Sequence, residues 1–238
     1  MVSKKDKRSN IDSKNKANNV RQHLRTLEER IRNREPLDRL DNKTYHSILM
    51  SGMEIFSEKG YKGTSLDEIA SKAGLTKGAI YWNFKNKLEL YNAIDNYVLT
   101  KIDKAVLESI SNATNCRSRI KILIRRTIEF YEENPKMFDF MMKVYEGPLA
   151  FRSMMTEKLA REYAFDRELL AEIISEGVKK GEFKRVNPET CALVLEGIID
   201  GVVMQWSIDR EGIDLNLAIS EIIKIVFDGI EQRNGRIR

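Results

Sequence analysis

The apolar residues of this chain recur at intervals of three and four, which is the spacing of one face of an α-helix. In residues 44–60, Ile48, Leu49, Met53 and Phe56 follow this spacing, and Gly60 stands where such a helix would end. The same periodicity predicts further helices over residues 86–111, 117–133, 136–145, 150–179, 188–209 and 214–232. The sequence offers no convincing alternation of apolar and polar residues, the mark of a half-buried strand. The pattern therefore predicts an all-α fold.

Two short helices joined by a tight turn are predicted between residues 64 and 84. Ser65 and Glu68 have the spacing of an N-terminal capping box. Gly74 permits the turn, and Thr76 can cap the second short helix. Together with the helix over residues 44–60, these elements have the layout of a helix-turn-helix, a three-helix head that binds DNA.

The second short helix carries side chains that suit a DNA groove. Lys77 is a flexible cation that can donate to guanine, and Gly78 lets the backbone approach the bases closely. The Tyr81 hydroxyl can donate to a phosphate, and Lys87 follows at the start of the next helix, where a phosphate is favoured. The alternative is an ordinary surface helix whose aromatic residues are partly buried between helices.

Residues 45–90, and the run TSLDEIASKAGLTKGAIYWNFKNKLEL most of all, resemble the DNA-binding domain of the TetR family of bacterial repressors. The AcrR-like regulators of multidrug efflux, which have a very similar GAIYW run, are the subgroup that it resembles most. Asn83 stands where relatives often carry histidine. The DNA contacts that the resemblance implies are Thr64, Ser65, Thr76, Lys77, Gly78, Ala79, Tyr81, Trp82, Asn83 and Lys87.

The resemblance also implies an architecture and a mechanism. Members of this family are homodimers in which each subunit reads half of a near-palindromic operator. A C-terminal domain binds a small molecule that changes the separation of the two reading heads. We therefore expect an arm over residues 1–42, a helix-turn-helix domain over 43–90, and an effector-binding and dimerisation domain over 91–238.

The leading arm holds the chain's excess of positive charge. Residues 1–42 contain 12 Lys and Arg against 7 Asp and Glu, whereas the remainder holds 29 of each. Residues 1–15 have the composition of a disordered segment. Residues 16–35 predict one amphipathic helix with a narrow apolar stripe, ended by Pro36. This helix either docks on its own domain or adds contacts to DNA phosphates.

Five of the nine methionines lie in residues 137–155, mixed with aromatic residues. Methionine is flexible and polarizable, as a pocket for varied apolar molecules requires. The alternative is that these side chains simply fill a core. The candidate lining residues of an apolar effector cavity are Met141, Tyr145, Phe151, Met154, Tyr163 and Trp206.

The last two predicted helices have wide apolar faces, and Asn187 with Pro188 is a suitable start for the first of them. Two glycines four residues apart would let a neighbouring helix come close. Such faces suit a dimer formed by a four-helix bundle with two helices from each subunit, although they also suit packing within one chain. The candidate interface residues are Leu195, Gly197, Ile198, Gly201, Val202, Ile222 and Val226.

Composition narrows the function further. Two histidines and two separated cysteines leave little for a metal site, a disulfide framework or acid–base catalysis, so we expect no enzyme, metal or cofactor. The N-terminus has no secretory leader, and the apolar run 191–206 is interrupted by Glu196 and Asp200, which predicts a buried helix and a cytoplasmic protein without membrane contact. The predicted function is a transcriptional regulator, most simply a repressor that a small apolar ligand releases from its operator. The alternative is a regulator of the same fold controlled by a protein partner.

Overall fold

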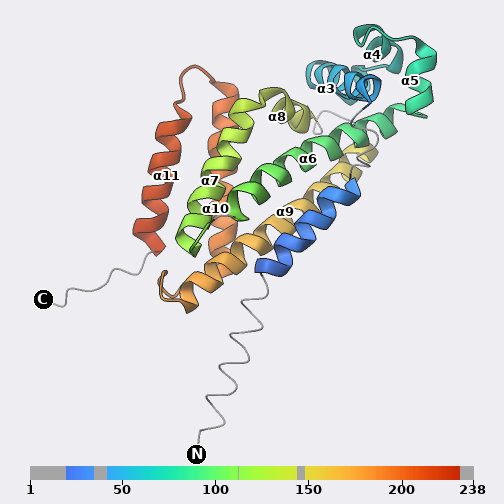
Figure 1. Ribbon diagram of the computed structural model, residues 1–238. Coiled ribbons are helices and arrows are strands. Elements are labelled where there is room, and N and C mark those ends of the chain that lie inside the picture. The colour runs from blue at the N-terminus through green and yellow to red at the C-terminus, as the bar shows by residue number, and fades with distance from the viewer. Residues whose placement is uncertain (1–19, 35–41, 112, 144–147, 231–238) are drawn as a thin grey trace, which may run out of the picture. The chain divides into compact units, whose positions relative to one another are not determined.

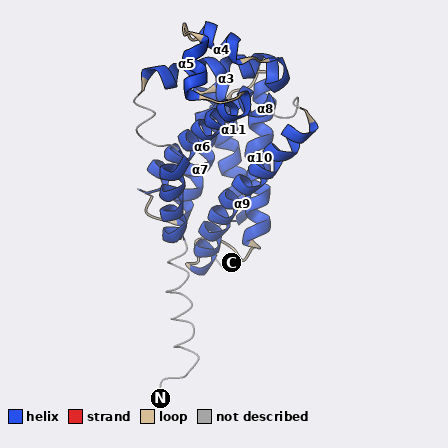
Figure 2. Cartoon of the chain, turned by 90° about the vertical axis from the view of Figure 1, so that its right-hand side faces the viewer, coloured by secondary structure: helices blue, strands red, loops and turns tan. Residues whose placement is uncertain are grey.

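The computed structural model describes residues 20–34, 42–111, 113–143 and 148–230, without the side chains of Leu149, Ala150 and Arg152. Over these ranges the regular elements are α-helices joined by short connections (Figures 1 and 2). The predicted all-α fold is therefore confirmed. The predictions for residues 1–15 and for Tyr145 concern positions outside the described ranges.

The helices follow the periodic segments of the sequence closely. The first spans residues 20–34. The others are α3 (Lys43–Gly63), α4 (Leu66–Lys72), α5 (Lys77–Asn83), α6 (Lys87–Ser111), α7 (Cys116–Glu133), α8 (Pro135–Met142), α9 (Leu149–Lys179), α10 (Pro188–Ile208) and α11 (Leu215–Ile230).

Local capping explains several of these boundaries. Asn187 accepts a hydrogen bond from the backbone of Thr190 at 2.8 Å, and Pro188 follows in the first turn of α10, as the sequence predicts. Gly60 departs from helical geometry with φ 68°, so the predicted end of the helical run lies at the kink inside α3. Ser65 caps α4 through the backbone N–H of Glu68.

Contacts between Cα atoms divide the chain into two compact units. Among the described residues, the helix-turn-helix unit comprises 29–34, 42–105, 130–143 and 148–161, and the C-terminal unit comprises 20–28, 106–111, 113–129 and 162–230. Helices α6, α7 and α9 contribute residues to both units. Residues 91–105, 130–143 and 148–161 thus belong to the same unit as the DNA-binding elements. The predicted functional division at residue 90 stays a prediction.

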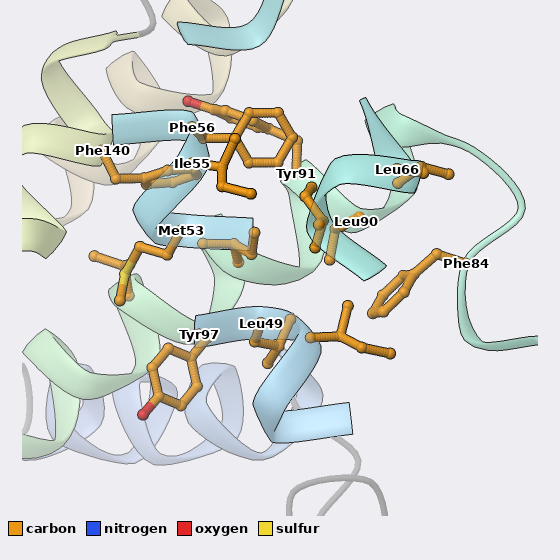
Figure 3. Close-up of a cluster of buried hydrophobic side chains, with 14 of the residues drawn as sticks. Leu49, Met53, Ile55, Phe56, Leu66, Phe84, Leu90, Tyr91, Tyr97 and Phe140 are labelled. Atoms are coloured by element: carbon orange, nitrogen blue, oxygen red, sulfur yellow. The ribbon is translucent and has the colours of Figure 1, made fainter. Parts of the chain in front are cut away.

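The core of the helix-turn-helix unit is built on α3, which packs against α4 and α8. Figure 3 shows the rings of Phe56, Tyr91 and Phe140 close together in this core. The centroids of Phe56 and Tyr91 are 5.0 Å apart, and those of Tyr91 and Phe140 are 4.5 Å apart. At the surface, Glu54 of α3 pairs with Lys136 of α8 and Lys72 of α4, which lowers the pKa of its carboxyl. Aromatic packing and ion pairs together hold α8 on the DNA-binding head.

In the C-terminal unit, the first residues of the N-terminal helix dock on the unit's own side chains. Val20 and Leu27 are buried, and His23 lies 2.9 Å from the Glu172 carboxylate and 4.8 Å from the Phe165 ring centroid. Of the two interpretations of this helix, the described residues favour docking over a free DNA-binding arm.

Helix α10 was predicted to be buried, but much of its surface is exposed. It is long and apolar enough to cross a membrane by length and composition, yet only 28% of its most apolar window is buried. One face packs inward with Ala192, Ile199 and Val203, and α11 lies beside it (Figure 1). The other face stays exposed because both faces of α10 are apolar and one chain covers only one of them.

Candidate DNA-binding site

The turn between α4 and α5 sets the direction in which α5 packs on the head. Gly74 takes a left-handed conformation with φ 68°, which side-chain-bearing residues rarely adopt. Leu75 donates a backbone hydrogen bond to Ala70 at 2.9 Å and packs against the core. Thr76 then caps α5 by accepting from the backbone of Ala79 at 3.3 Å. The turn residues therefore fix the direction in which α5 starts.

Helix α5 divides into a buried side and an exposed side. Ile80 and the following Phe84 are buried, so they anchor the helix to the head. Trp82 is 90% exposed and Tyr81 is 53% exposed, an unusual state for large aromatic side chains. Since these rings lie outside the head's own core, the alternative of a surface helix with its aromatics buried between helices does not fit.

Gly78 lies on the exposed side of α5. A Cβ atom at this position would meet only the Thr76 hydroxyl oxygen, at 3.9 Å. The fold of the head itself therefore leaves room for a larger side chain, and nothing in the described contacts requires glycine here. A close approach by a bound partner would supply such a requirement.

Lys77 is exposed but already has a partner. Its ammonium lies 2.5 Å from the Asp67 carboxylate of α4, and this hydrogen bond raises the pKa of Lys77. An exposed ion pair of this kind contributes little to stability. Lys77 is therefore a fully charged donor that must leave Asp67, or share it, to reach a base.

Two expected phosphate contacts at the start of α4 are placed differently. Ser65 is exposed, and its hydroxyl oxygen accepts from the Glu68 backbone. Thr64 is only 4% exposed, and its hydroxyl donates to the Gly60 carbonyl at 2.8 Å. The Thr64 hydroxyl closes the end of the preceding helix, so its predicted phosphate contact, which stays a prediction, would require this bond to break. In a full capping box the Glu68 carboxylate would also accept from the Ser65 backbone N–H. Here that carboxylate pairs with Lys59 instead.

Lys87 lies at the first turn of α6 and contacts its own chain. The ammonium donates to the Thr64 carbonyl at 2.7 Å and lies 4.6 Å from the centroid of the Tyr61 ring. Partial burial lowers the pKa of Lys87. Asn83, the remaining predicted contact, is half-buried and donates its side-chain amide to the Ala79 carbonyl at 2.8 Å. Both side chains lie on the head, but neither is a freely extended surface group.

The described candidate effector residues are divided between the two units. Phe151 is buried in the helix-turn-helix unit, where its ring stacks on Tyr61. Met141 is half-buried in the same unit, and Met154 is 37% exposed. Tyr163 and Trp206 belong to the C-terminal unit. The aromatic and methionine-rich segment thus packs against α3 and α6, which is what the core-filling alternative describes.

The candidate interface residues divide between the two faces of α10 and α11. Leu195, Ile222 and Val226 are buried within the single chain, so their apolar surface is already covered. Gly197 is exposed, and Ile198, Gly201 and Val202 are half-buried. The exposed apolar residues of the outer face are Leu193, Val194, Met204, Ile208, Leu217 and Ile225, of which sequence reasoning singled out only Leu217, as part of the apolar face of the last helix.

A polar pair between α9 and α10 was also missed. Arg167 donates to Glu196 at 2.7 Å, and the second carboxylate oxygen of Glu196 is buried without a protein partner. Burial raises the pKa of Glu196, and the bond from Arg167 opposes that rise. The Tyr163 hydroxyl hydrogen-bonds to Asp200, one turn further along α10. The signal in the sequence was the four-residue spacing of two acids inside an apolar run.

Comparison with known proteins agrees with the geometry of the head. Residues 48–94 match the family model of bacterial regulatory proteins of the tetR family. The Tn10 TetC protein of Escherichia coli is 29% identical over 170 residues, which cover 71% of this chain and 81% of that protein. The HTH-type transcriptional regulator AcrR of Shigella flexneri is 25% identical over 194 residues, covering 78% and 88% of the two chains.

A solved structure has the same fold. The SmeT–triclosan complex superposes with a TM-score of 0.67 over 80% of this chain and 93% of that chain, at 20% identity. The matched residues 48–94 include the turn at Gly74, the exposed helix α5 and Lys87. Residues 48–94 therefore form a DNA-binding domain of the tetR family, and AcrR of Shigella flexneri is among the regulators that most of the chain resembles.

Proposed function

We propose that this protein is a homodimeric repressor that binds a palindromic operator and is released by a small apolar molecule. The observation that carries the proposal is helix α5, which is held by a buried side and exposes Tyr81 and Trp82 beside Lys77 and Gly78. A recognition helix enters the major groove with small side chains and donors near its N-terminus.

The roles of the α5 side chains follow from their positions. Lys77, Gly78 and Ala79 lie in the first turn, nearest to the base edges. Tyr81 and Trp82 lie one turn on, where their polar edges reach the sugar–phosphate backbone. Ser65 and Lys87 add phosphate contacts from α4 and α6, because a hydroxyl and a cation remain available there to a polyanion.

The second subunit covers the outer face of α10 and α11. Gly197 and Gly201 lie on this face, and a Cβ atom at either would meet nothing within 4 Å. Leu193 and Val194 of α10 are each more than half exposed, as are Leu217 and Ile225 of α11. Exposed apolar side chains on two neighbouring helices are typical of an interaction site, and two helices from each subunit would form a four-helix bundle.

The effector binds in the C-terminal unit, near Tyr163 and Trp206. The Tyr163 hydroxyl is fixed by Asp200, and Trp206 is buried with Arg210 5.0 Å from its ring centroid. The similar protein SmeT has been solved in complex with triclosan, an observation on that protein that supports a small-molecule effector here. To release the operator, the effector must prefer the conformation whose heads no longer fit both half-sites.

Fluorescence of Trp82 tests the operator contact. Trp206→Phe leaves Trp82 as the only tryptophan, and Trp82 is solvent-exposed in the free protein. Operator duplex should change the Trp82 emission at a stoichiometry of one dimer per site. Gly78→Ala should keep the melting temperature, because the added methyl has room and alanine favours a helix, but should weaken operator binding about tenfold. Unchanged Trp82 emission on saturation would refute the placement of α5 in the groove.

A second experiment separates the effector from the protein-partner alternative. In a thermal-shift screen with hydrophobic compounds, a true effector should raise the melting temperature and weaken operator binding in the same concentration range. Compounds that stabilise the protein without changing its affinity for operator, or the absence of stabilising compounds, would favour control by a protein partner.

A further inference from the structure

Within the helix-turn-helix unit, the ring of Tyr61 contacts two side chains that are far from it in sequence, those of Lys87 and Phe151. On one side it stacks on Phe151 of α9, with ring centroids 4.0 Å apart and an interplanar angle of 13°. The ammonium of Lys87 lies 4.6 Å from the centroid of the same ring. These are the distances of an aromatic stack and of a cation–π contact.

The surroundings of Tyr61 restrict its movement. Its ring is edge-on to Tyr91, with centroids 5.6 Å apart, and lies parallel to Phe56, with centroids 6.1 Å apart. Burial raises the pKa of the Tyr61 hydroxyl, so the ring remains neutral at any physiological pH. Since Tyr61 is in the last turns of α3, the ring is held by α3, α6 and the start of α9 together.

The Lys87 side chain is positioned by this ring and by one carbonyl. One N–H of its ammonium donates to the Thr64 carbonyl at 2.7 Å. An ammonium has three N–H donors, so this bond leaves others for a phosphate oxygen. The long lysine side chain has many rotamers, and a fixed ring and carbonyl reduce the conformational entropy that must be lost on binding DNA.

We infer that Tyr61 and Phe151 are positioning residues for the Lys87 phosphate contact, through the series Phe151–Tyr61–Lys87. The inference rests on the proposed operator function. It implies that the start of α9 affects the affinity of the DNA-binding head for operator. Helix α9 contributes residues to both units, so displacement of its first turn removes the support of the ring beside Lys87.

The salt dependence of operator binding tests this series. Each phosphate contact contributes about 0.9 to the slope of log affinity against log salt concentration. Lys87→Ala, Tyr61→Leu and Phe151→Met should each reduce the slope by up to that amount per subunit and weaken binding about three- to tenfold. Tyr61→Phe keeps the aromatic ring and should therefore leave the slope at its wild-type value.

A double-substitution cycle distinguishes positioning from general destabilisation. In the Lys87→Ala background, Tyr61→Leu should produce no further loss, because the side chain that it positions is gone. Phe130→Leu is the matched control: Phe130 is buried in the same unit, and its ring packs edge-on against Tyr131 rather than against Tyr61. This control should lower the melting temperature and keep the salt slope. Binding is measured on the folded fraction, determined by circular dichroism.

The failures of the two proposals can be told apart. Wild-type protein that binds no operator would refute the proposed function, and the inference with it. If operator binding is intact and Lys87→Ala lowers the slope but Tyr61→Leu and Phe151→Met do not, the inference alone is wrong. Full additivity of Tyr61→Leu and Lys87→Ala would contradict it equally, as would an unchanged slope in Lys87→Ala.

Discussion

Two surfaces of this protein expose large apolar side chains, and their chemistry differs. On α5 the exposed residues are the aromatic Tyr81 and Trp82, which carry polar edges and stand beside Lys77. On α10 and α11 the exposed residues are aliphatic, as in Val194, Leu217 and Ile225, and two glycines lie among the residues of α10. The α5 surface suits DNA, which offers phosphates, sugars and base edges. The α10 and α11 surface suits a second pair of apolar helices.

The difference shows that exposure alone does not identify a partner. Aromatic residues with hydrogen-bond donors and cations are typical of nucleic-acid contacts, because each can meet a phosphate or a base edge. Aliphatic residues at helical spacing gain free energy only when they are removed from water, and packing against another apolar helix face achieves this. The predictions that follow separate the two surfaces experimentally.

The largest expected effect comes from placing charge on the outer face of α10 and α11. The double substitution Val194→Glu and Ile225→Glu would bury unpaired carboxylates in the proposed bundle, at about 3–5 kcal/mol for each buried charge. We expect the protein to become a folded monomer in sedimentation velocity and to lose operator binding, since one subunit reads only half of the site.

The matched control for this substitution is Met154→Glu, an apolar-to-acid change at an exposed residue of the other unit. It should leave the sedimentation coefficient of the dimer unchanged. If the doubly substituted protein remains a dimer with operator affinity intact, the outer face is not the interface, and the contrast between the two surfaces fails.

The next effect concerns base recognition by α5. Lys77→Ala should weaken binding to the selected operator about ten- to hundredfold and relax the base preference at one position of each half-site. Binding to a random duplex should change little. Competition anisotropy with both duplexes measures the ratio. Equal losses on the two duplexes would make Lys77 a phosphate contact instead.

A smaller effect of opposite sign is expected from the ion-pair partner of Lys77. Asp67→Asn removes a carboxylate that lies 2.5 Å from the Lys77 ammonium and competes with DNA for it. Operator affinity should rise about two- to fivefold, while the melting temperature hardly changes, because exposed ion pairs add little stability. A fall in affinity would show that Asp67 orients Lys77 for the groove.

The smallest effect is a pH dependence in the C-terminal unit. Burial raises the pKa of Glu196 above its ordinary value of 4.5, so the native state holds this proton at pH values where the unfolded chain has lost it. Stability therefore falls as the pH rises from the ordinary carboxyl range through the raised pKa. Glu196→Gln cannot titrate and should gain stability relative to wild type at pH 8 but not at pH 4. Urea unfolding at both pH values measures this. A variant that loses more stability at pH 8 would show that the bond to Arg167 dominates.

Much of the head could be predicted from sequence because its signals are local. Gly74 and Thr76 act through their own turns, so short stretches of sequence specify them. The Asn187–Pro188 pair at the start of α10, in the C-terminal unit, is local in the same way. The contact of Phe151 with Tyr61 joins residues 90 positions apart, and composition alone gave no sign of it. Thr64 turned inward because its hydroxyl found the Gly60 carbonyl, a competition that a motif does not reveal.

The outer face of α10 was mispredicted for a different reason. Apolar residues occur all round this helix, so periodicity could not distinguish the side that meets the chain's own core from the side left exposed. Leu195 was assigned to the interface and is buried within the chain, whereas Val194 is 54% exposed. Only packing against α11 and the rest of the unit decides between neighbouring residues of this kind.

Selection of bound duplexes from a randomised pool tests the central claim most directly. Purified full-length protein should enrich an inverted repeat whose half-sites are centred about 10 base pairs apart, or a multiple of that spacing. The same selection with Lys77→Ala should give a repeat that is degenerate at one position of each half-site. Enrichment of no sequence at low salt, or of the same unaltered repeat by both proteins, would contradict the reading of DNA by Lys77 at the start of α5.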